Sequence, residues 1–255
     1  PVRPSAGPAY GGLADSIDLS CCTEYTVEAG RPDTITREKL EVLFRRGCGR
    51  VSVNPQPMQD HVLAAMGRAH RGSDIRKAYA MARDSGIPCV NMDLIAGLPA
   101  DSVDGFRSSL DQVLAMAPEN ITVHTLAMKK GSRLMEEGSG VPADEEVAAM
   151  LEYARSALRT AGQIPYYLYR QQNMSGSFEN VGWCLPGTES LYTICMLEEL
   201  HTMVSLGGGG VTKLVDPAAG HIERIANPKY PKEYIEKIDA VCAGKERVAR
   251  FHGAL

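Results

Sequence analysis

The sequence contains no cysteines at the spacings that form metal-binding loops. Its seven cysteines include no CxxC or CxxxC pair; they are Cys21, Cys22, Cys48, Cys89, Cys184, Cys195 and Cys242. An odd number of cysteines is also a poor disulfide framework, which favours a reducing, cytoplasmic environment. We therefore predict no metal ligands in this chain.

The sequence also lacks long apolar runs and an excess of basic charge. No run reaches the roughly 18 apolar residues of a membrane-spanning helix, so no membrane span is expected. The net charge of -4 and the pI near 5.9 argue against a protein whose main task is to bind nucleic acid. With 255 residues, 44% of them hydrophobic, the chain is long enough for one large α/β domain or two small ones.

Short β-rich runs alternate with helical patterns through the first part of the chain. The pattern predicts strands at 24–29, 50–55, 89–99 and 120–127, and helices at 36–47, 60–86, 101–116 and 144–162. Four such alternations indicate a parallel sheet, and both an open sheet and a partial barrel fit. Residues 165–183 have a loop-like composition, and helices are expected again in 190–206 and 226–251. We place a domain boundary near residue 140, which gives domains 1–140 and 141–255.

Polar residues follow or end all four predicted strands. They are Glu28, Asn54, Gln56, Asp93, His124 and Thr125. Because the carboxyl ends of parallel strands form the ligand-binding edge of α/β folds, these side chains are expected to converge. Carboxylates there suit a ligand with an ammonium group and a ribose. Arg68 can bind a ligand carboxylate with two hydrogen bonds.

Each of these residues also has a simpler interpretation. Glu28 can pair with Arg31, two positions into the turn, and Asp93 can form a turn or cap a helix. His124, flanked by β-branched residues, fits an interior histidine, and Gln56 stands between two prolines that favour a turn. The regular placement of the residues, one set per strand, is what favours a shared site.

Four blocks of the chain resemble consecutive motifs of one enzyme superfamily. These blocks are EYTVEAGRPDTIT, VSVNPQPMQDHVLAAMGRAH, VNMDLIAGLPADSVDGF and PENITVHTLAMKKGS. They are similar to the radical S-adenosylmethionine (SAM) superfamily, and most similar to the oxygen-independent coproporphyrinogen III oxidase family. Within that family, EAGRPD resembles the coproporphyrinogen dehydrogenase-like branch, as do the later YRQQNMSGSFENVGW and GGGGVTKL. The likeness extends from about residue 18 onward.

The resemblance implies a partial (β/α) barrel, followed by a C-terminal α+β subdomain. It also implies the use of SAM and of a 4Fe-4S cluster that an electron donor reduces. It implies oxidative decarboxylation of the propionates of a tetrapyrrole, coproporphyrinogen III, to protoporphyrinogen IX in anaerobic heme biosynthesis. By position, SAM-contacting residues of the family match Glu28, Gln56, Arg68 and Asp93, with backbone contacts at Ala127 and near Val211. No catalytic residue is assigned by the resemblance.

Two motifs of that family are absent from this chain. Neither the CxxxCxxC loop, whose thiolates hold the cluster, nor the GGGTP motif is present. The lead PVRPSAGPAYGG has no apolar core of a signal peptide, and the spacing places Pro1 at the proline of GGGTP. We therefore expect the first barrel strands and the cluster loop to lie upstream, the chain alone to be inert as a radical enzyme, and its first strand to lie at an open sheet edge.

Two other functions stay open. One is a cluster-free heme-binding or heme-carrier protein of the same family, with His124, His201 or His221 as the heme ligand. The other is an ordinary parallel-barrel enzyme that uses Glu28 and Asp93 as acid and base, which requires the two carboxyl groups to lie close together.

Overall fold

The computed structural model of this protein describes residues 17–127, 140–170 and 178–253, so the expected place of Pro1 lies outside the described residues. The chain forms two compact units, Pro1–Ser190 and Leu191–Leu255. None of the helices that the structure describes is long and apolar enough to cross a bilayer.

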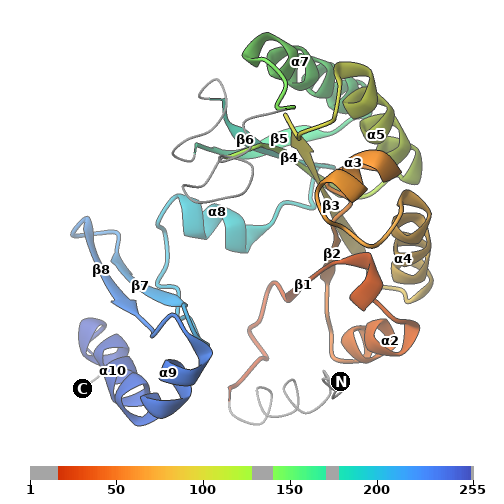
Figure 1. The fold of residues 1–255 in the computed structure, drawn as a ribbon. Helices are drawn as coiled ribbons and strands as arrows, with labels where there is room; N and C mark the ends of the chain where they lie inside the picture. Colours follow the sequence, from red (N-terminus) through yellow and green to blue (C-terminus); the bar gives the residue numbers. More distant parts are fainter. Residues whose placement is uncertain (1–16, 128–139, 171–177, 254–255) are drawn as a thin grey trace. The chain divides into compact units, whose positions relative to one another are not determined.

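A six-stranded sheet is the centre of the first unit (Figure 1). Its strands, in spatial order, are β1 (Thr26–Gly30), β2 (Arg50–Val53), β3 (Cys89–Ala96), β4 (Asn120–Thr125), β6 (Asn180–Cys184) and β5 (Ile164–Tyr169). Strands β1 to β4 are parallel, and β6 is antiparallel to both of its neighbours. The expected parallel sheet is confirmed. In the described residues the sheet does not close into a barrel, and β1 pairs with β2 alone, so β1 is an edge strand.

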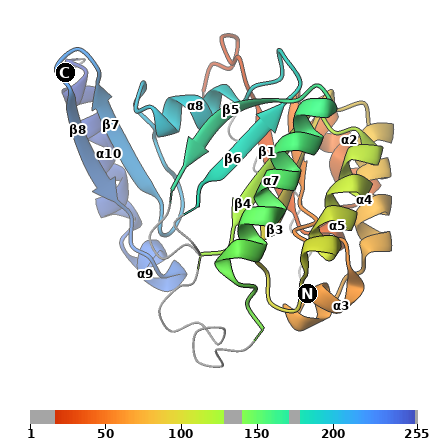
Figure 2. The same cartoon turned by 90° about the horizontal axis from the view of Figure 1, so that it is seen from above.

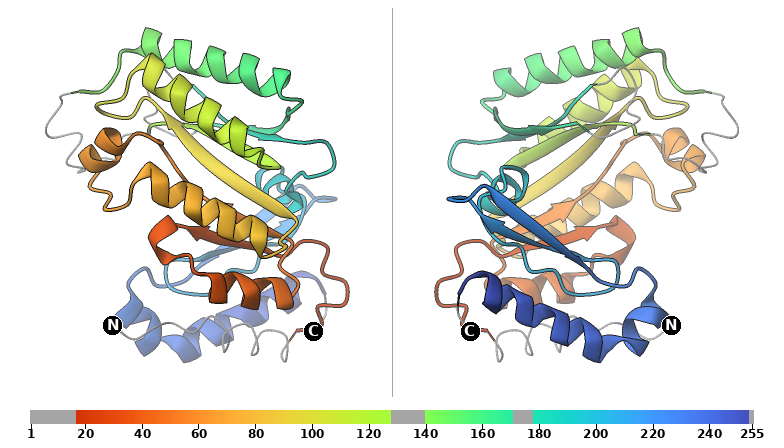
Figure 3. Two further views of the ribbon diagram at one scale, coloured as in Figure 1. Left: turned by 90° about the vertical axis from the view of Figure 1, so that its right-hand side faces the viewer. Right: turned by 90° about the vertical axis from the view of Figure 1, so that its left-hand side faces the viewer.

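Helices cover one face of this sheet, which we call the outer face (Figures 2 and 3). The four that lie side by side across it are α2 (Arg37–Arg45), α4 (Gly72–Asp84), α5 (Val103–Met116) and α7 (Asp144–Thr160). The short η1 (Pro32–Thr34) and α3 (Asp60–Ala65) follow the carboxyl ends of β1 and β2. Local sequence sets where the helices begin, because the hydroxyl of Thr36 accepts from the Lys39 N–H and that of Ser102 accepts from the Gly105 N–H.

The alternation of side chains along the strands divides the sheet into an apolar and a polar face. Val53, Met92, Leu94 and Val123 point to the outer face and are almost fully buried under the helices. Each such side chain contributes roughly 1.5–3 kcal/mol by leaving water. The residues between them are polar and point to the opposite face, which we call the inner face. The helices therefore cover the apolar face of the sheet, and the polar residues lie on the face that these helices do not cover.

Residues 165–183 include two strands rather than the expected loop. β5 and β6 pair with each other, and β6 pairs with β4, so both belong to the first sheet. At Gly182 the ring of Tyr167 occupies the space that a side chain would fill. Aromatic residues favour strands, but the polar residues around them hid this signal. The first compact unit ends at Ser190, whereas the sequence predicts a domain boundary near residue 140.

The second unit combines helices with a two-stranded sheet, as expected of an α+β subdomain. It contains α8 (Leu191–Leu197), β7 (Val211–Asp216), β8 (His221–Ala226), α9 (Pro231–Glu236) and α10 (Ile238–Phe251). β7 and β8 form an antiparallel hairpin. The glycine run before β7 is a tight turn, in which Gly209 has a φ of +75° and its N–H donates to the Pro228 carbonyl.

Candidate functional site

The carboxylate of Glu28 lies on the inner side of the edge strand β1. Its Oε1 accepts a hydrogen bond of 2.8 Å from the Ser52 hydroxyl on β2. Arg31, the alternative partner, pairs with Asp33 at 2.8 Å instead. Loss of hydration raises the pKa of the Glu28 carboxyl; the Ser52 hydrogen bond opposes this rise, and the charge of Asp93 adds to it. As a residue of an edge strand, Glu28 keeps part of its surface exposed, so a ligand can reach it.

A chain of hydrogen bonds continues from Ser52 across the inner face of the sheet. The Asn91 side-chain amide donates to the Ser52 hydroxyl at 3.3 Å and to Asp93 Oδ1 at 2.9 Å. The Thr122 hydroxyl donates to Asn91 Oδ1 at 3.5 Å and lies 3.2 Å from the Tyr167 hydroxyl. Sequence reasoning missed Ser52, Asn91, Thr122 and Tyr167. The available signal was their two-residue spacing along strands that also carry the predicted site residues.

Arg50 fills the amino-terminal end of the inner face. One guanidinium nitrogen donates to the carbonyls of Thr188 and Glu189 at 3.0 Å each, and another donates to the Asn120 side chain. The Arg50 Nε lies 3.7 Å from the carboxylate of Glu24. The protein's own groups therefore occupy this end of the inner face, and Glu28 and Asp93 lie closer to the carboxyl ends of their strands.

Gln56 adopts a strained conformation that fixes the loop after β2. Its φ of +66° is uncommon for a residue other than glycine and costs about 1–3 kcal/mol. Its backbone pairs with β3: the Gln56 N–H donates to the Asp93 carbonyl at 2.9 Å, and the Ile95 N–H donates to the Gln56 carbonyl at 3.0 Å. Its side-chain oxygen accepts from Arg68 at 2.6 Å. The loop therefore brings Gln56 and Arg68 together at the end of β3.

Asp93 and His124 face each other from adjacent strands. Asp93 is a residue of β3 rather than of a turn, and its Oδ2 lies 3.8 Å from His124 Nε2. The His124 side chain is 28% exposed, so it is not sealed in the core. Glu28 and Asp93 are close enough for their charges to interact.

The two predicted backbone contacts lie in different parts of the chain. Ala127 comes directly after β4, where the Leu126 N–H donates to the Ala96 carbonyl at the end of β3. It therefore lies at the same edge of the sheet as Asp93. Val211 begins β7 in the second unit. Both stay predictions as SAM contacts.

The polar atoms at the strand ends match the donors of SAM. In the described part of the chain, Asn54 Oδ1 is buried without a hydrogen-bond partner. Together with the carboxylates of Glu28 and Asp93, it provides acceptors for an ammonium group and ribose hydroxyls. Arg68 has donors for a carboxylate. These residues fit SAM.

The described residues do not fit a 4Fe-4S cluster. All seven cysteines are free, and within the described ranges no three side chains from His, Cys, Asp or Glu are placed to hold a metal ion. Burial raises the pKa of the Cys89 thiol to about 11, which disfavours the thiolate that a cluster requires.

Comparisons with known proteins assign part of the chain to a family. Residues 20–113 match the profile of the Radical SAM superfamily, and these residues include Glu28, Gln56, Arg68 and Asp93. This part of the chain belongs to the radical SAM superfamily. The resemblance seen in the sequence is thereby confirmed at the level of the superfamily domain.

Similar proteins and structures extend the likeness beyond this domain. The chain is 44% identical over 224 residues, 87% of its length, to the oxygen-independent coproporphyrinogen-III oxidase-like protein HemZ of Bacillus subtilis, and covers 45% of it. It is 31% identical over 154 residues to the heme chaperone HemW of the same organism, covering 59% of this chain and 40% of HemW. The structure of coproporphyrinogen III oxidase (HemN) from Escherichia coli matches the fold with a TM-score of 0.71 at 18% identity, over 91% of this chain and 52% of HemN.

The chain thus spans about half the length of the curated relatives it matches. Residues 114–190 and the second unit lie outside the matched profile, and their likeness rests on the relatives and the HemN fold.

His70 is a buried histidine beside Arg68 whose two ring nitrogens have no hydrogen-bond partner in the described residues. Burial lowers the pKa of the His70 imidazole; Asp33 and Asp74 oppose this, and the charges of Arg68 and Arg31 add to it. The His70 imidazole is therefore neutral in the folded protein. In acid the unfolded chain can protonate this imidazole more readily than the folded protein can, so a lower pH favours the unfolded state.

We predict that His70→Phe weakens the pH dependence of stability. In the wild type, the free energy of unfolding should fall from about pH 7 to about pH 5, because the unfolded state binds a proton that the folded state resists. Phenylalanine has a similar shape and no proton to bind, so the fall should be smaller in the variant. Urea unfolding at both pH values measures the difference. The exposed His61→Phe on α3 is the control and should behave like the wild type; an undiminished fall in His70→Phe contradicts the prediction.

Proposed function

We propose that this chain is the SAM-binding part of a radical SAM oxidoreductase that acts on a tetrapyrrole. In the full protein, the reaction is the oxidative decarboxylation of coproporphyrinogen III propionates to protoporphyrinogen IX, in the cytoplasm, with an electron donor for the cluster. The observation that supports SAM binding most strongly is the convergence of Glu28, Asp93 and the Gln56–Arg68 pair at one edge of the parallel sheet. The 44% identity to the HemZ oxidase-like protein supports the substrate class.

Each residue of the site has a defined task in this proposal. Glu28, held by Ser52, accepts from the ammonium group of SAM, and Arg68, held by Gln56, binds its carboxylate. Asp93, oriented by the Asn91 amide, accepts from a ribose hydroxyl. When bound, SAM supplies hydrogen-abstraction chemistry. Because the described residues do not hold the cluster that this chemistry needs, the chain alone is expected to bind SAM without cleaving it.

We expect a longer form of the protein that carries a CxxxCxxC loop to cleave SAM under reducing, anaerobic conditions. Asp93→Asn in that form should lower SAM cleavage by about ten-fold or more at limiting SAM, because a charge-assisted hydrogen bond is weakened. Release of 5′-deoxyadenosine is the measurement, with coproporphyrinogen III present and absent.

The matched control is Asp104→Asn on the outer-face helix α5, where the carboxylate is 94% exposed and pairs with Arg107 one turn along the helix. It should cleave SAM as the wild type does. Failure of the longer wild-type form to produce 5′-deoxyadenosine contradicts the proposed reaction. Equal activity of the two aspartate variants contradicts the role of Asp93.

A second candidate function is heme binding by the second unit. A pocket of about 430 Å³ there is lined by His201 and His252, together with Phe251 and Val215. The Thr202 hydroxyl lies 2.8 Å from His252 Nε2, and Val215 N–H donates to the same hydroxyl, which orients the imidazole. The likeness to HemW, named a heme chaperone, makes a pocket lined by two histidines relevant.

If the second unit binds heme, hemin added to the chain should produce a shifted Soret absorption band. His201→Ala or His252→Ala should remove the shift, whereas His124→Ala in the first unit should leave it intact. An unchanged hemin spectrum excludes this candidate. Loss of the shift in His124→Ala alone places the heme in the first unit instead.

A further inference from the structure

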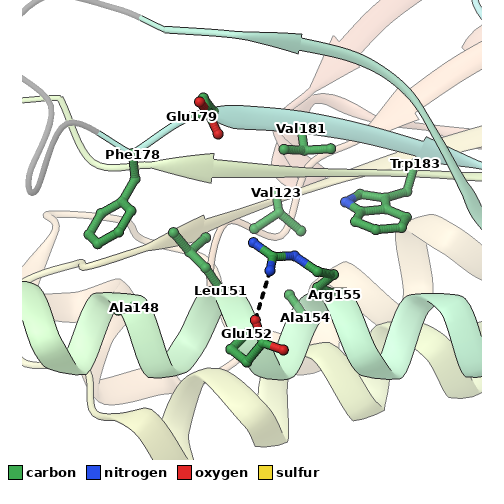
Figure 4. A pocket seen from close by; sticks show the side chains of 10 residues that line it. All are labelled: Val123, Ala148, Leu151, Glu152, Ala154, Arg155, Phe178, Glu179, Val181 and Trp183. Atoms are coloured by element: carbon green, nitrogen blue, oxygen red, sulfur yellow. Dashed lines mark hydrogen bonds and ion pairs between the residues drawn. The ribbon is translucent and has the colours of Figure 1, made fainter.

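A cavity of about 300 Å³ lies on the outer face of the sheet, between α7 and strands β4 and β6 (Figure 4). Val123 on β4 and Val181 and Trp183 on β6 form its floor, and Leu151 and Ala154 on α7 form the opposite wall. Phe178 lies at one end. The cavity is separated from the SAM site by the thickness of the sheet, because Glu28 and Asp93 point to the inner face.

Residues of the cavity floor and of the α7 wall are apolar and already removed from water. Val123 and Ala154 are each 2% exposed, and Trp183 is 5% exposed. Protein interiors are packed with few voids larger than a water molecule, and apolar cavities stay dry and accept apolar molecules. A volume of this size is at the lower end of that of small-molecule sites. Binding of a ligand would therefore be stabilised if an apolar group of that ligand filled the cavity.

One cation lies over this apolar floor. Figure 4 shows the Arg155 guanidinium directed into the space between α7 and Val123 and Val181. Its NH1 donates to Glu152, one turn away on the same helix, at 2.9 Å. Both side chains of this pair are more than half exposed, so the pair is worth little and is easily rearranged. The remaining guanidinium N–H groups have no hydrogen-bond partner in the described part of the chain.

The acidic groups at the rim define the charge of the ligand. Glu179 is paired with Arg170 at 2.7 Å, and Glu152 is paired with Arg155. Arg155 can therefore accept a singly charged carboxylate in a two-pronged contact without leaving a buried charge unpaired. A doubly charged phosphate group would meet repulsion from both glutamates. The rim therefore disfavours a doubly charged ligand more than a singly charged one.

We propose that this cavity binds a small amphipathic carboxylic acid, with its hydrocarbon part against Trp183 and Leu151 and its carboxylate on Arg155. The site is independent of the proposed SAM site and goes beyond the proposed function. It adds a second ligand to the first unit, on the face of the sheet that the SAM chemistry does not use.

Trp183 makes the test direct, because it is the one tryptophan in the chain. Octanoate is the probe and octanol its neutral counterpart, both transparent where tryptophan absorbs. We expect octanoate to cause a saturable change in Trp183 fluorescence and to bind about ten-fold or more tightly than octanol. Arg155→Gln should reduce octanoate affinity to that of octanol and leave octanol binding unchanged. Arg159→Gln, on the last turn of the same helix and outside the cavity, is the matched control and should bind both probes as the wild type does.

A second variant tests the cavity itself. Ala148 lines it from the exposed side of α7, so Ala148→Phe should fill the space and abolish binding of both probes while far-UV circular dichroism stays unchanged. The proposal is overturned if Trp183 fluorescence does not respond to octanoate, if octanol binds as tightly as octanoate, or if Arg155→Gln binds octanoate normally. It is also overturned if Trp183 fluorescence changes with protein concentration when neither probe is present. A second copy of the chain would then occupy the cavity.

Discussion

Hydrogen bonding across the inner face of the sheet is the constraint on which the rest of the structure depends. Strand pleating places every second side chain of the parallel strands on this face, and the sequence makes most of them polar. Buried polar groups are costly unless they are paired, so Ser52, Asn91 and Thr122 bond to one another across three strands. This network orients the two carboxylates at its margin, Glu28 and Asp93.

The strained loop after β2 completes that edge at a cost in free energy. Gln56 is held with a positive φ because its backbone pairs with β3 on both sides of the peptide, and its side chain holds Arg68 in turn. Strain of this kind persists only where the surroundings enforce it, and it is concentrated at functional sites.

On the outer face the constraint is different. There the helices must cover apolar strand residues, and α7 leaves a cavity over β4 and β6 that Arg155 borders.

The sequence was sufficient to predict the parallel strands, the helices between them and the polar strand ends, because these features follow from periodicity and from the geometry of parallel sheets. Glu28 and Asp93 were predicted on that basis, and the structure places both on the inner face. The partners that hold them, Ser52 and Asn91, were not predicted, because a hydrogen bond between strands depends on register, which periodicity does not define. β5 and β6 were missed because their aromatic residues, the tyrosines of β5 and Trp183 of β6, stand among polar residues. The cavity beside α7 depends on packing between elements distant in the sequence.

The affinity of the chain for SAM, measured by isothermal titration calorimetry in the wild type and in Glu28→Gln, tests the central claim most directly. Glutamine keeps an acceptor for Ser52 but lacks the charge that an ammonium group requires. The account predicts that the wild type binds SAM and that the variant binds at least about ten-fold more weakly. Glu41→Gln, which changes an exposed side chain on α2, should bind as the wild type does. Equal affinity in Glu28→Gln and the wild type, or no binding by the wild type, would contradict the assignment of the strand ends as the SAM site.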